Sequence, residues 1–125
     1  MPRVLIADDE DSMRTLVARA IAMDGHETVT AQDGAEALEI LTREGGAFDL
    51  LLTDIQMPIM DGIALALSAA RDFPNLTILL MTGFADQRER ASHLNAIAHD
   101  VITKPFSVAD IRTAVADALA SRKAD

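Results

Sequence analysis

Polar side chains follow four apolar segments of this chain, each at the point where the segment ends. They are carboxylates, a hydroxyl and an ammonium. If the four segments are parallel strands of one sheet, their carboxyl ends share one edge, and in open α/β sheets that edge forms the active crevice. The sequence therefore predicts one acidic pocket, built from Asp8, Asp9, Asp54, Thr82 and Lys104.

Such a pocket suits a divalent cation and a phosphoryl group. Carboxylate oxygens are the ligands that Mg²⁺ prefers. A cation, an ammonium and a hydroxyl together neutralise the charge of a phosphoryl group, which otherwise opposes attack by a carboxylate. Asp54 is then the expected nucleophile. Without the cation the carboxylates of Asp8, Asp9 and Asp54 repel one another, so we expect phosphoryl transfer to require Mg²⁺.

Each of these residues also has an ordinary interpretation when taken alone. Asp8 and Asp9 could lie in a solvated loop before a helix, where the helix dipole favours carboxylates. Asp54 could be a turn residue, and Thr82 could mark the exit of a strand. Lys104 is harder to explain in this way, since the chain has only two lysines and this one lies between an expected strand and a proline. The joint placement at four strand ends favours the functional interpretation.

The elements that position these residues alternate between strand and helix. Apolar runs predict strands, apolar residues at helical spacing predict the helices between them, and capping residues, glycines and prolines bound both. Five βα repeats with right-handed crossovers imply an α/β protein with a parallel sheet covered on both faces. The expected strands span residues 3–7, 27–31, 49–53, 77–81 and 100–103, and the expected helices cover about 13–25, 34–45, 63–73, 86–96 and 108–119.

The expected third helix carries almost no polar residue. Leu65 falls opposite a stripe formed by Ile63, Ala66, Leu67 and Ala70. This helix is either well covered by the rest of the protein or presents a small apolar contact patch.

Composition indicates one soluble domain. The 125 residues are enough to bury a core, and no apolar run approaches the ~18 residues that a membrane span needs. The chain has no secretory signal at its start and no cysteine for disulfides or thiolate metal sites. Its net charge of −9 disfavours nucleic acid as a partner. We therefore expect a single cytoplasmic domain over residues 1–125, without an output domain, a membrane partner or a nucleic-acid partner.

Four motifs together resemble the receiver domain of two-component response regulators. The resemblance covers the whole chain, and it implies a flavodoxin-like (CheY-like) fold with a five-stranded parallel sheet in the order 2-1-3-4-5 and five helices on its two faces. The motifs are Asp8-Asp9, Asp54-Ile55-Gln56-Met57-Pro58 with Asp61-Gly62, Thr82-Gly83 and Thr103-Lys104-Pro105-Phe106.

This resemblance implies a role for each acidic residue of the pocket. Asp54 accepts a phosphoryl group from the phosphohistidine of a sensor histidine kinase or a histidine phosphotransferase. Asp9, Asp54 and the backbone carbonyl of Gln56 bind Mg²⁺, and Asp8 acts mainly through a water on the metal. The chain is then a phosphoacceptor that phosphorylates and dephosphorylates itself, and not an enzyme acting on other substrates.

The resemblance also implies how the phosphoryl group is contacted and sensed. Thr82 and Lys104 contact the phosphoryl oxygens, and the Lys104–Pro105 bond is expected to be cis. Most receivers carry Tyr or Phe three residues before this lysine, and that ring turns inward as the threonine moves. Here the position holds Val101, so the usual coupling from Thr82 to an aromatic ring is in question.

Two rings are expected near the same pocket. Phe84 directly follows the third motif, Thr82-Gly83, and Phe106 is the last residue of the fourth. Because Val101 has no ring, we expect phosphorylation to act chiefly on residues 83–85 and on the start of the helix after them.

Two stretches narrow the resemblance. Residues 81–90 and 99–107 resemble single-domain receivers of the CpdR type of alphaproteobacteria. Such receivers act with a cell-cycle phosphorelay and, when unphosphorylated, help the ClpXP protease to take up selected substrates. The resemblance thus implies ClpX or ClpXP and its substrates as partners. A phosphorelay carrier and a chemotaxis-type binding switch use the same chemistry and stay open.

Two other classes are disfavoured by single positions. A haloacid-dehalogenase-like phosphatase needs a second aspartate two residues after the nucleophile, where this chain has Gln56. A flavodoxin-like cofactor carrier needs a phosphate-binding loop after the first strand. The acidic residues at 8–11 would repel a flavin phosphate there.

Overall fold

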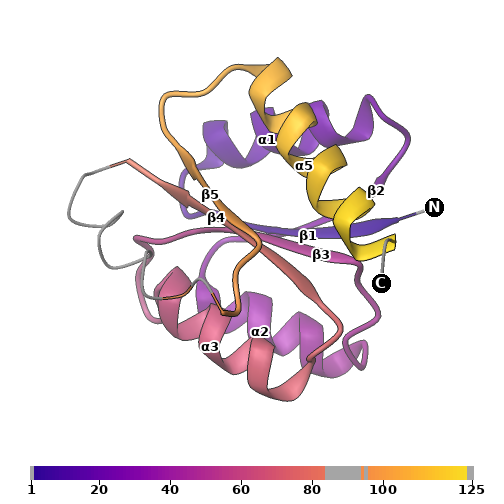
Figure 1. Cartoon of the computed structure of the whole chain (residues 1–125). Helices are drawn as coiled ribbons and strands as arrows, with labels where there is room; N and C mark the ends of the chain where they lie inside the picture. The colour runs from indigo at the N-terminus through magenta and orange to yellow at the C-terminus, as the bar shows by residue number, and fades with distance from the viewer. Residues whose placement is uncertain (1, 84–93, 95, 124–125) are drawn as a thin grey trace.

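A computed structural model describes residues 2–83, 94 and 96–123 of the chain. These residues form three layers, with one sheet between the pair α1 and α5 and the pair α2 and α3 (Figure 1). The strands are β1 (Arg3–Ala7), β2 (Glu27–Ala31), β3 (Leu50–Asp54), β4 (Thr77–Thr82) and β5 (Asp100–Thr103), and the helices are α1 (Asp11–Ala22), α2 (Gly34–Arg43), α3 (Gly62–Asp72) and α5 (Val108–Lys123).

The sheet has the predicted topology. Its order is β2-β1-β3-β4-β5, and every neighbouring pair is parallel. The register pairs Asp54 with Met81 and Thr82 with Thr103, so the last residues of β3, β4 and β5 lie at one edge of the sheet. The sequence-predicted convergence of strand ends is therefore confirmed.

The helix content differs from the prediction of five. The part of the chain that the structure describes contains four α-helices. The expected helix at 86–96 falls almost entirely on residues 84–93 and 95, which lie outside the described residues. No helix in the described part has the length and apolar character that crossing a bilayer requires.

Two cores stabilise the layers, one on each face of the sheet. Leu51 of β3 points into the core beneath α2 and α3, whereas its neighbours Leu50 and Leu52 point into the core beneath α1 and α5. This alternation follows from the period of two along a strand. Since both faces are covered, all five residues of β3 are buried.

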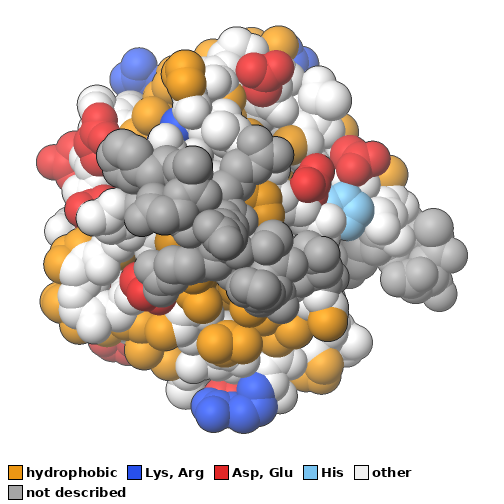
Figure 2. Space-filling view, turned by 60° about the vertical axis from the view of Figure 1, so that its left-hand side comes forward, with side chains coloured by type: hydrophobic (Ala, Val, Ile, Leu, Met, Phe, Trp, Pro, Cys, Tyr) orange, Lys and Arg blue, Asp and Glu red, His pale blue; other side chains and the backbone are white. Residues whose placement is uncertain are grey.

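The apolar residues of α3 are divided between the core and the surface. Leu65 is buried, whereas Leu67 is 51% exposed. Leu65 therefore faces the core, and the stripe of Ile63, Ala66, Leu67 and Ala70 does not form one continuous face, since Ala66 is buried as well. Apolar side chains gather on the lower part of the face in Figure 2, which is the side of α2 and α3.

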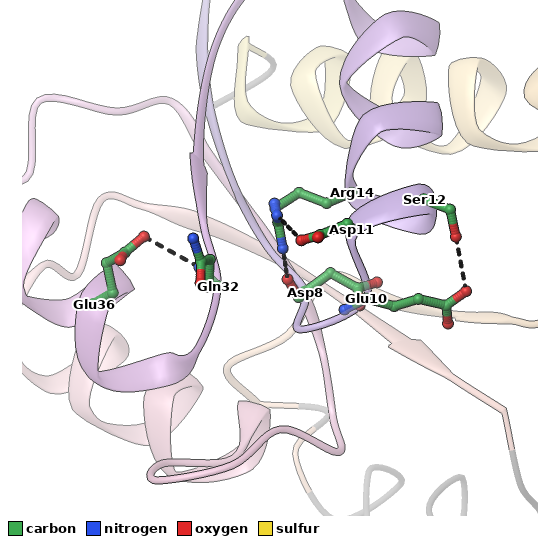
Figure 3. Close-up of polar contacts among 7 residues, drawn as sticks. All are labelled: Asp8, Glu10, Asp11, Ser12, Arg14, Gln32 and Glu36. Carbon is green, nitrogen blue, oxygen red and sulfur yellow. Dashed lines mark hydrogen bonds and ion pairs between the residues drawn. The ribbon is translucent and has the colours of Figure 1, made fainter.

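Capping residues fix where the helices that flank the site begin. The Asp110 N–H donates to Ser107 Oγ at 3.0 Å, and the Ser107 N–H donates to Asp110 Oδ2 at 2.9 Å, which makes a reciprocal cap for α5. The cap of α2 is less regular. Asp33 accepts from the Glu36 N–H at 2.8 Å, but Glu36 accepts from the N–H of Gln32 (Figure 3), one residue earlier than in a capping box.

Candidate metal and phosphoacceptor site

Asp8 lies fully buried directly after β1. Its N–H donates to the Ala31 carbonyl at 3.1 Å, which extends the pairing of β1 with β2 by one residue. Its Oδ1 accepts from the Glu10 N–H at 3.0 Å. Its Oδ2 is buried and has no hydrogen-bond partner among the described residues. A buried carboxylate oxygen without a partner is costly, so this oxygen indicates a site for a cation.

Two further carboxylates meet Asp8 at the edge of the sheet. Asp54 ends β3 and is 6% exposed, and Asp9 lies exposed in the loop after β1. One oxygen from each of the three carboxylates lies within 4.8 Å of the other two. This cluster fits a divalent cation such as Mg²⁺, because it offers several oxygen ligands and one of them is buried without a hydrogen-bond partner among the described residues.

The neighbouring acidic residues do not join this cluster. The Glu10 carboxylate accepts from Ser12 Oγ at 3.0 Å, and the Asp11 carboxylate pairs with Arg14 (Figure 3). The acidic side chains of this loop therefore form two groups, one in the carboxylate cluster and one at the first turn of α1.

Lys104 brings a positive charge to the cluster from the end of β5, two strands away from β3 in the sheet. Its Nζ lies 3.1 Å from Asp54 Oδ1 and 3.7 Å from Asp8 Oδ2. Its backbone N–H donates to the Thr82 carbonyl at 2.7 Å, so the backbone at the end of β4 fixes its position. The Lys104–Pro105 bond is cis, as the family resemblance implied.

Burial dominates the electrostatics of the two inner carboxylates. It raises the pKa of Asp8 above the ordinary value of 3.8, although the Glu10 N–H and Lys104 act in the opposite direction. Burial also raises the pKa of Asp54, with Lys104 again opposing and the charge of Asp8 adding to the rise. A cation in the cluster would favour the ionised form of both groups, which is the nucleophilic form of Asp54.

Two contacts hold the backbone at Asp54. Thr53 Oγ1 donates to the Asp54 carbonyl at 2.9 Å. Gly62, at the start of α3, packs on the same carbonyl, and a Cβ at Gly62 would lie 2.0 Å from this oxygen. The loop from 55 to 61 therefore returns to the end of β3, and a side chain at position 62 does not fit there.

Thr82 and Gln56 occupy the expected places along the chain. Thr82 is the last residue of β4 and is fully buried. Gln56 is exposed, two residues after Asp54, in the loop that leads to α3. The contact of Thr82 with a phosphoryl oxygen and the binding of Mg²⁺ by the Gln56 carbonyl stay predictions.

Arg14 is a neighbour of the site that sequence reasoning missed. Its Nη1 donates to the backbone carbonyl of Asp8 at 2.8 Å. The signal in the sequence was an arginine in the first turn of a helix, where the helix dipole disfavours a positive charge.

Comparison with known proteins identifies the family. Residues 4–116 match the response regulator receiver domain. The chain belongs to this family. Receiver domains take phosphate from histidine kinases or phosphotransferases and bind Mg²⁺ at an acidic pocket, which agrees with the cluster of Asp8, Asp9 and Asp54.

One relative is similar over nearly its whole length. The chain is 39% identical over 111 residues to the response regulator receiver protein CpdR of Brucella abortus, and the match covers 89% of this chain and 91% of CpdR. This receiver is therefore similar to CpdR, as residues 81–90 and 99–107 indicated.

Solved receiver structures share the fold. A receiver domain protein from Clostridium thermocellum, 24% identical, superposes with a TM-score of 0.89 over 98% of both chains, which shows the fold. TrrA from Thermotoga maritima, solved in complex with Mg²⁺ and BeF, is 29% identical. Its TM-score is 0.83, over 95% of this receiver and 100% of TrrA.

Proposed function

We propose that this receiver accepts a phosphoryl group on Asp54 from a phosphohistidine protein. The observation that carries the proposal is the position of Lys104 Nζ, 3.1 Å from Asp54 Oδ1, beside a buried Asp8 oxygen that has no hydrogen-bond partner among the described residues. A nucleophilic carboxylate, an ammonium and acidic oxygens that can bind a divalent cation are the groups that phosphoryl transfer needs.

The transfer step balances with groups of this chain and of the donor. An Asp54 carboxylate oxygen forms a bond to phosphorus, and the P–N bond to the donor imidazole breaks. The electron pair of that bond goes to the imidazole nitrogen, which takes up a proton. Lys104 neutralises charge on the phosphoryl oxygens, and we assign the Thr82 hydroxyl to hydrogen bonding with the same group.

Asp8, Asp9, Asp54 and the carbonyl of Gln56 would hold the cation. When bound, Mg²⁺ supplies positive charge that offsets the charge of the phosphoryl group. Asp54 itself is the residue whose loss must abolish the reaction.

Asp54→Asn tests this assignment. The amide is nearly isosteric with the carboxylate but is a poor nucleophile, so we expect the variant to fold and to take up no phosphoryl group. Wild-type protein, Asp54→Asn and the control Asp72→Asn, an exposed aspartate on α3, are incubated with a small phosphodonor and Mg²⁺. Intact-mass measurement then reports phosphorylation. Acid-labile phosphate on Asp54→Asn, at the level of the control, would contradict the assignment.

The finer proposal concerns the output. Similarity to CpdR over 91% of that protein supports a role in regulated proteolysis, with the unphosphorylated form assisting ClpXP in cell-cycle control. A phosphorelay carrier or a chemotaxis-type binding switch is the alternative, because both use the same phosphoacceptor chemistry. Binding to the protease in the absence of phosphate distinguishes the first role from the other two.

Purified ClpX provides the direct test. We expect ClpX to bind the metal-free protein and Asp54→Asn, and to bind more weakly once beryllofluoride and Mg²⁺ mimic the phosphorylated state of the wild type. Asp54→Asn in beryllofluoride serves as the control, since it has no acceptor for the mimic. Tighter binding in the mimic state, or no binding in either state, would contradict the protease role and leave phosphorylation of Asp54 unaffected.

A further inference from the structure

Arg14 lies beside the acidic cluster without belonging to it. The residue is in the first turn of α1, and its side chain is 14% exposed. Figure 3 shows the guanidinium turned back toward the loop between β1 and α1, between Asp8 and Asp11. A cation at the amino end of a helix is electrostatically disfavoured, so specific contacts must hold it there.

Two contacts hold the guanidinium against this loop. Nη1 donates to the backbone carbonyl of Asp8 at 2.8 Å, and Nη2 pairs with the Asp11 carboxylate. The backbone N–H of Arg14 also donates to the Glu10 carbonyl at 2.9 Å. The segment from Asp8 to Asp11 is thereby tied at its start and at its end by one side chain.

The carboxylate of Asp8 also constrains the segment from Asp8 to Asp11. Asp8 Oδ1 accepts from the Glu10 N–H at 3.0 Å, which leaves Oδ2 directed to Lys104 at 3.7 Å. Rotation of the Asp8 peptide would move this carboxylate and would also move Asp9, the next residue. The contact of Arg14 with the Asp8 carbonyl opposes that rotation.

We propose that Arg14 is a positioning residue for Mg²⁺, which holds the backbone of Asp8 so that the carboxylates of Asp8 and Asp9 face the cation. This role rests on the proposed function, because it presumes a cation in the cluster. Arg14 itself touches neither the cation nor the phosphoryl group.

Arg14 has two opposing effects on the binding of a cation. Its contact with the Asp8 carbonyl orders the ligands and favours binding, whereas its positive charge repels the cation. Its pairing with the Asp11 carboxylate offsets part of this charge. Positioning therefore outweighs repulsion, and removal of Arg14 weakens the binding of Mg²⁺. Residues that orient metal ligands typically change metal affinity by about 10–100-fold.

Matched variants separate positioning from charge and from stability. Arg14→Met keeps an apolar stem but removes both contacts, and Arg14→Lys keeps the charge and one possible donor for the Asp8 carbonyl. Arg112→Met is the control. It removes an arginine that pairs with Asp24 at 2.6 Å, and this pair links α5 to the segment after α1, away from the acidic cluster.

The measurement is the dissociation constant of Mg²⁺, from amide shifts of the metal-free protein during titration. We expect Arg14→Met to bind at least about tenfold more weakly than wild type, Arg14→Lys to lie between the two, and Arg112→Met to stay within about twofold of wild type. We also expect the Asp8 and Glu10 amides of metal-free Arg14→Met to shift before any Mg²⁺ is added.

Several outcomes would overturn the role. Equal affinity in wild type and Arg14→Met would mean that the contact does not position the ligands, and tighter binding in Arg14→Met would mean that charge repulsion dominates. If Arg14→Met does not fold, Arg14→Lys decides, because unchanged affinity in that folded variant together with unshifted Asp8 and Glu10 amides contradicts the role. Failure of the wild type to bind Mg²⁺ would contradict the proposed function first, and the role of Arg14 with it.

Discussion

The Nζ of Lys104 lies 3.1 Å from Oδ1 of Asp54, although β4 separates the strands that these residues follow and end. The lysine thus reaches across the end of β4, where Thr82 lies buried. An ammonium placed in this way offsets the charge of the Asp54 carboxylate, and under the proposed function it would also contact the phosphoryl oxygens. The contact also places a fixed positive charge next to the carboxylate cluster for which we propose cation binding.

Removal of this lysine should leave the binding of Mg²⁺ intact and weaken the structural response to phosphorylation. We expect Lys104→Ala to bind Mg²⁺ at least as tightly as wild type, because the ammonium that competes for Asp54 and Asp8 is gone. The variant should respond poorly to beryllofluoride, because it lacks a charge-assisted contact that exists only in the modified state. Titration with Mg²⁺, followed by amide shifts with beryllofluoride, measures both properties.

Lys104→Arg is the matched variant for this prediction. It retains a positive charge, so part of the response should return. If Lys104→Ala lost its affinity for Mg²⁺ together with the response, the division of roles between the lysine and the carboxylates would be wrong.

The placement of the site could be predicted from the sequence because strand ends are local signals. The bounds of β1, β2 and β5 are as predicted, and parallel pairing then brings Asp8, Asp54 and Lys104 to one edge. The bounds of β3 differ by one residue, since pairing with Met81 extends that strand to include Asp54. Tertiary pairing decides such a boundary, and the apolar pattern alone does not contain it.

Contacts to backbone atoms could not be predicted in the same way. Arg14 and Thr53 act on the carbonyls of Asp8 and Asp54, and no side-chain pattern indicates which carbonyl a donor reaches. The core on which each of Phe106 and Val101 packs was not predicted either. The Phe106 ring packs on the core beneath α1 and α5, whereas Val101 packs on the core beneath α2 and α3.

In the metal-free protein, ionisation of Asp8 and Asp54 should lower the free energy of unfolding as the pH rises. Burial raises the pKa of Asp8 and Asp54, so the folded state holds these protons to higher pH than the unfolded chain does. The stability contributed by this protonation is complete below the ordinary pKa of 3.8 and is lost as the pH rises through the raised, folded-state pKa. Asp54→Asn removes one of the two groups. Relative to wild type, we expect the variant to gain unfolding free energy as the pH rises from about 4 to about 7.

Urea denaturation in EDTA at both pH values measures this difference. Saturating Mg²⁺ provides the control, since about 100-fold excess over the dissociation constant should stabilise the wild type by about 2.7 kcal/mol. If the unfolding free energies of variant and wild type differ as much at the low pH as at the high pH, ionised Asp54 does not destabilise the fold.

The contact between Gly62 and Asp54 predicts a large effect of one methyl group. A Cβ at Gly62 would lie 2.0 Å from the Asp54 carbonyl oxygen, so the loop or the strand end must move. We expect Gly62→Ala to lose about 2–3 kcal/mol of unfolding free energy and to be phosphorylated more slowly than wild type. Gly83→Ala is the control for stability, because its added Cβ meets Lys104 Cδ at 3.9 Å, an ordinary contact. Equal stability of the two variants would contradict the prediction.

The last prediction concerns how phosphorylation reaches a partner. Phosphorylation shifts a two-state equilibrium only by the difference in its interactions with the two states. We expect Thr82 and Lys104 to supply that difference at the site, but Val101 is half-buried on β5 and has no ring to transmit it. Phe106 does not substitute, because it packs on the opposite face of the sheet. We therefore expect beryllofluoride to shift the amides of residues 83–85 and of the segment directly after them far more than the amides of β5 and α5. Of residues 83–85 and the segment directly after them, only Gly83 lies within the described part of the chain. Amide shifts confined to β5 and α5 would show instead that the last strand and helix carry the response without an aromatic ring.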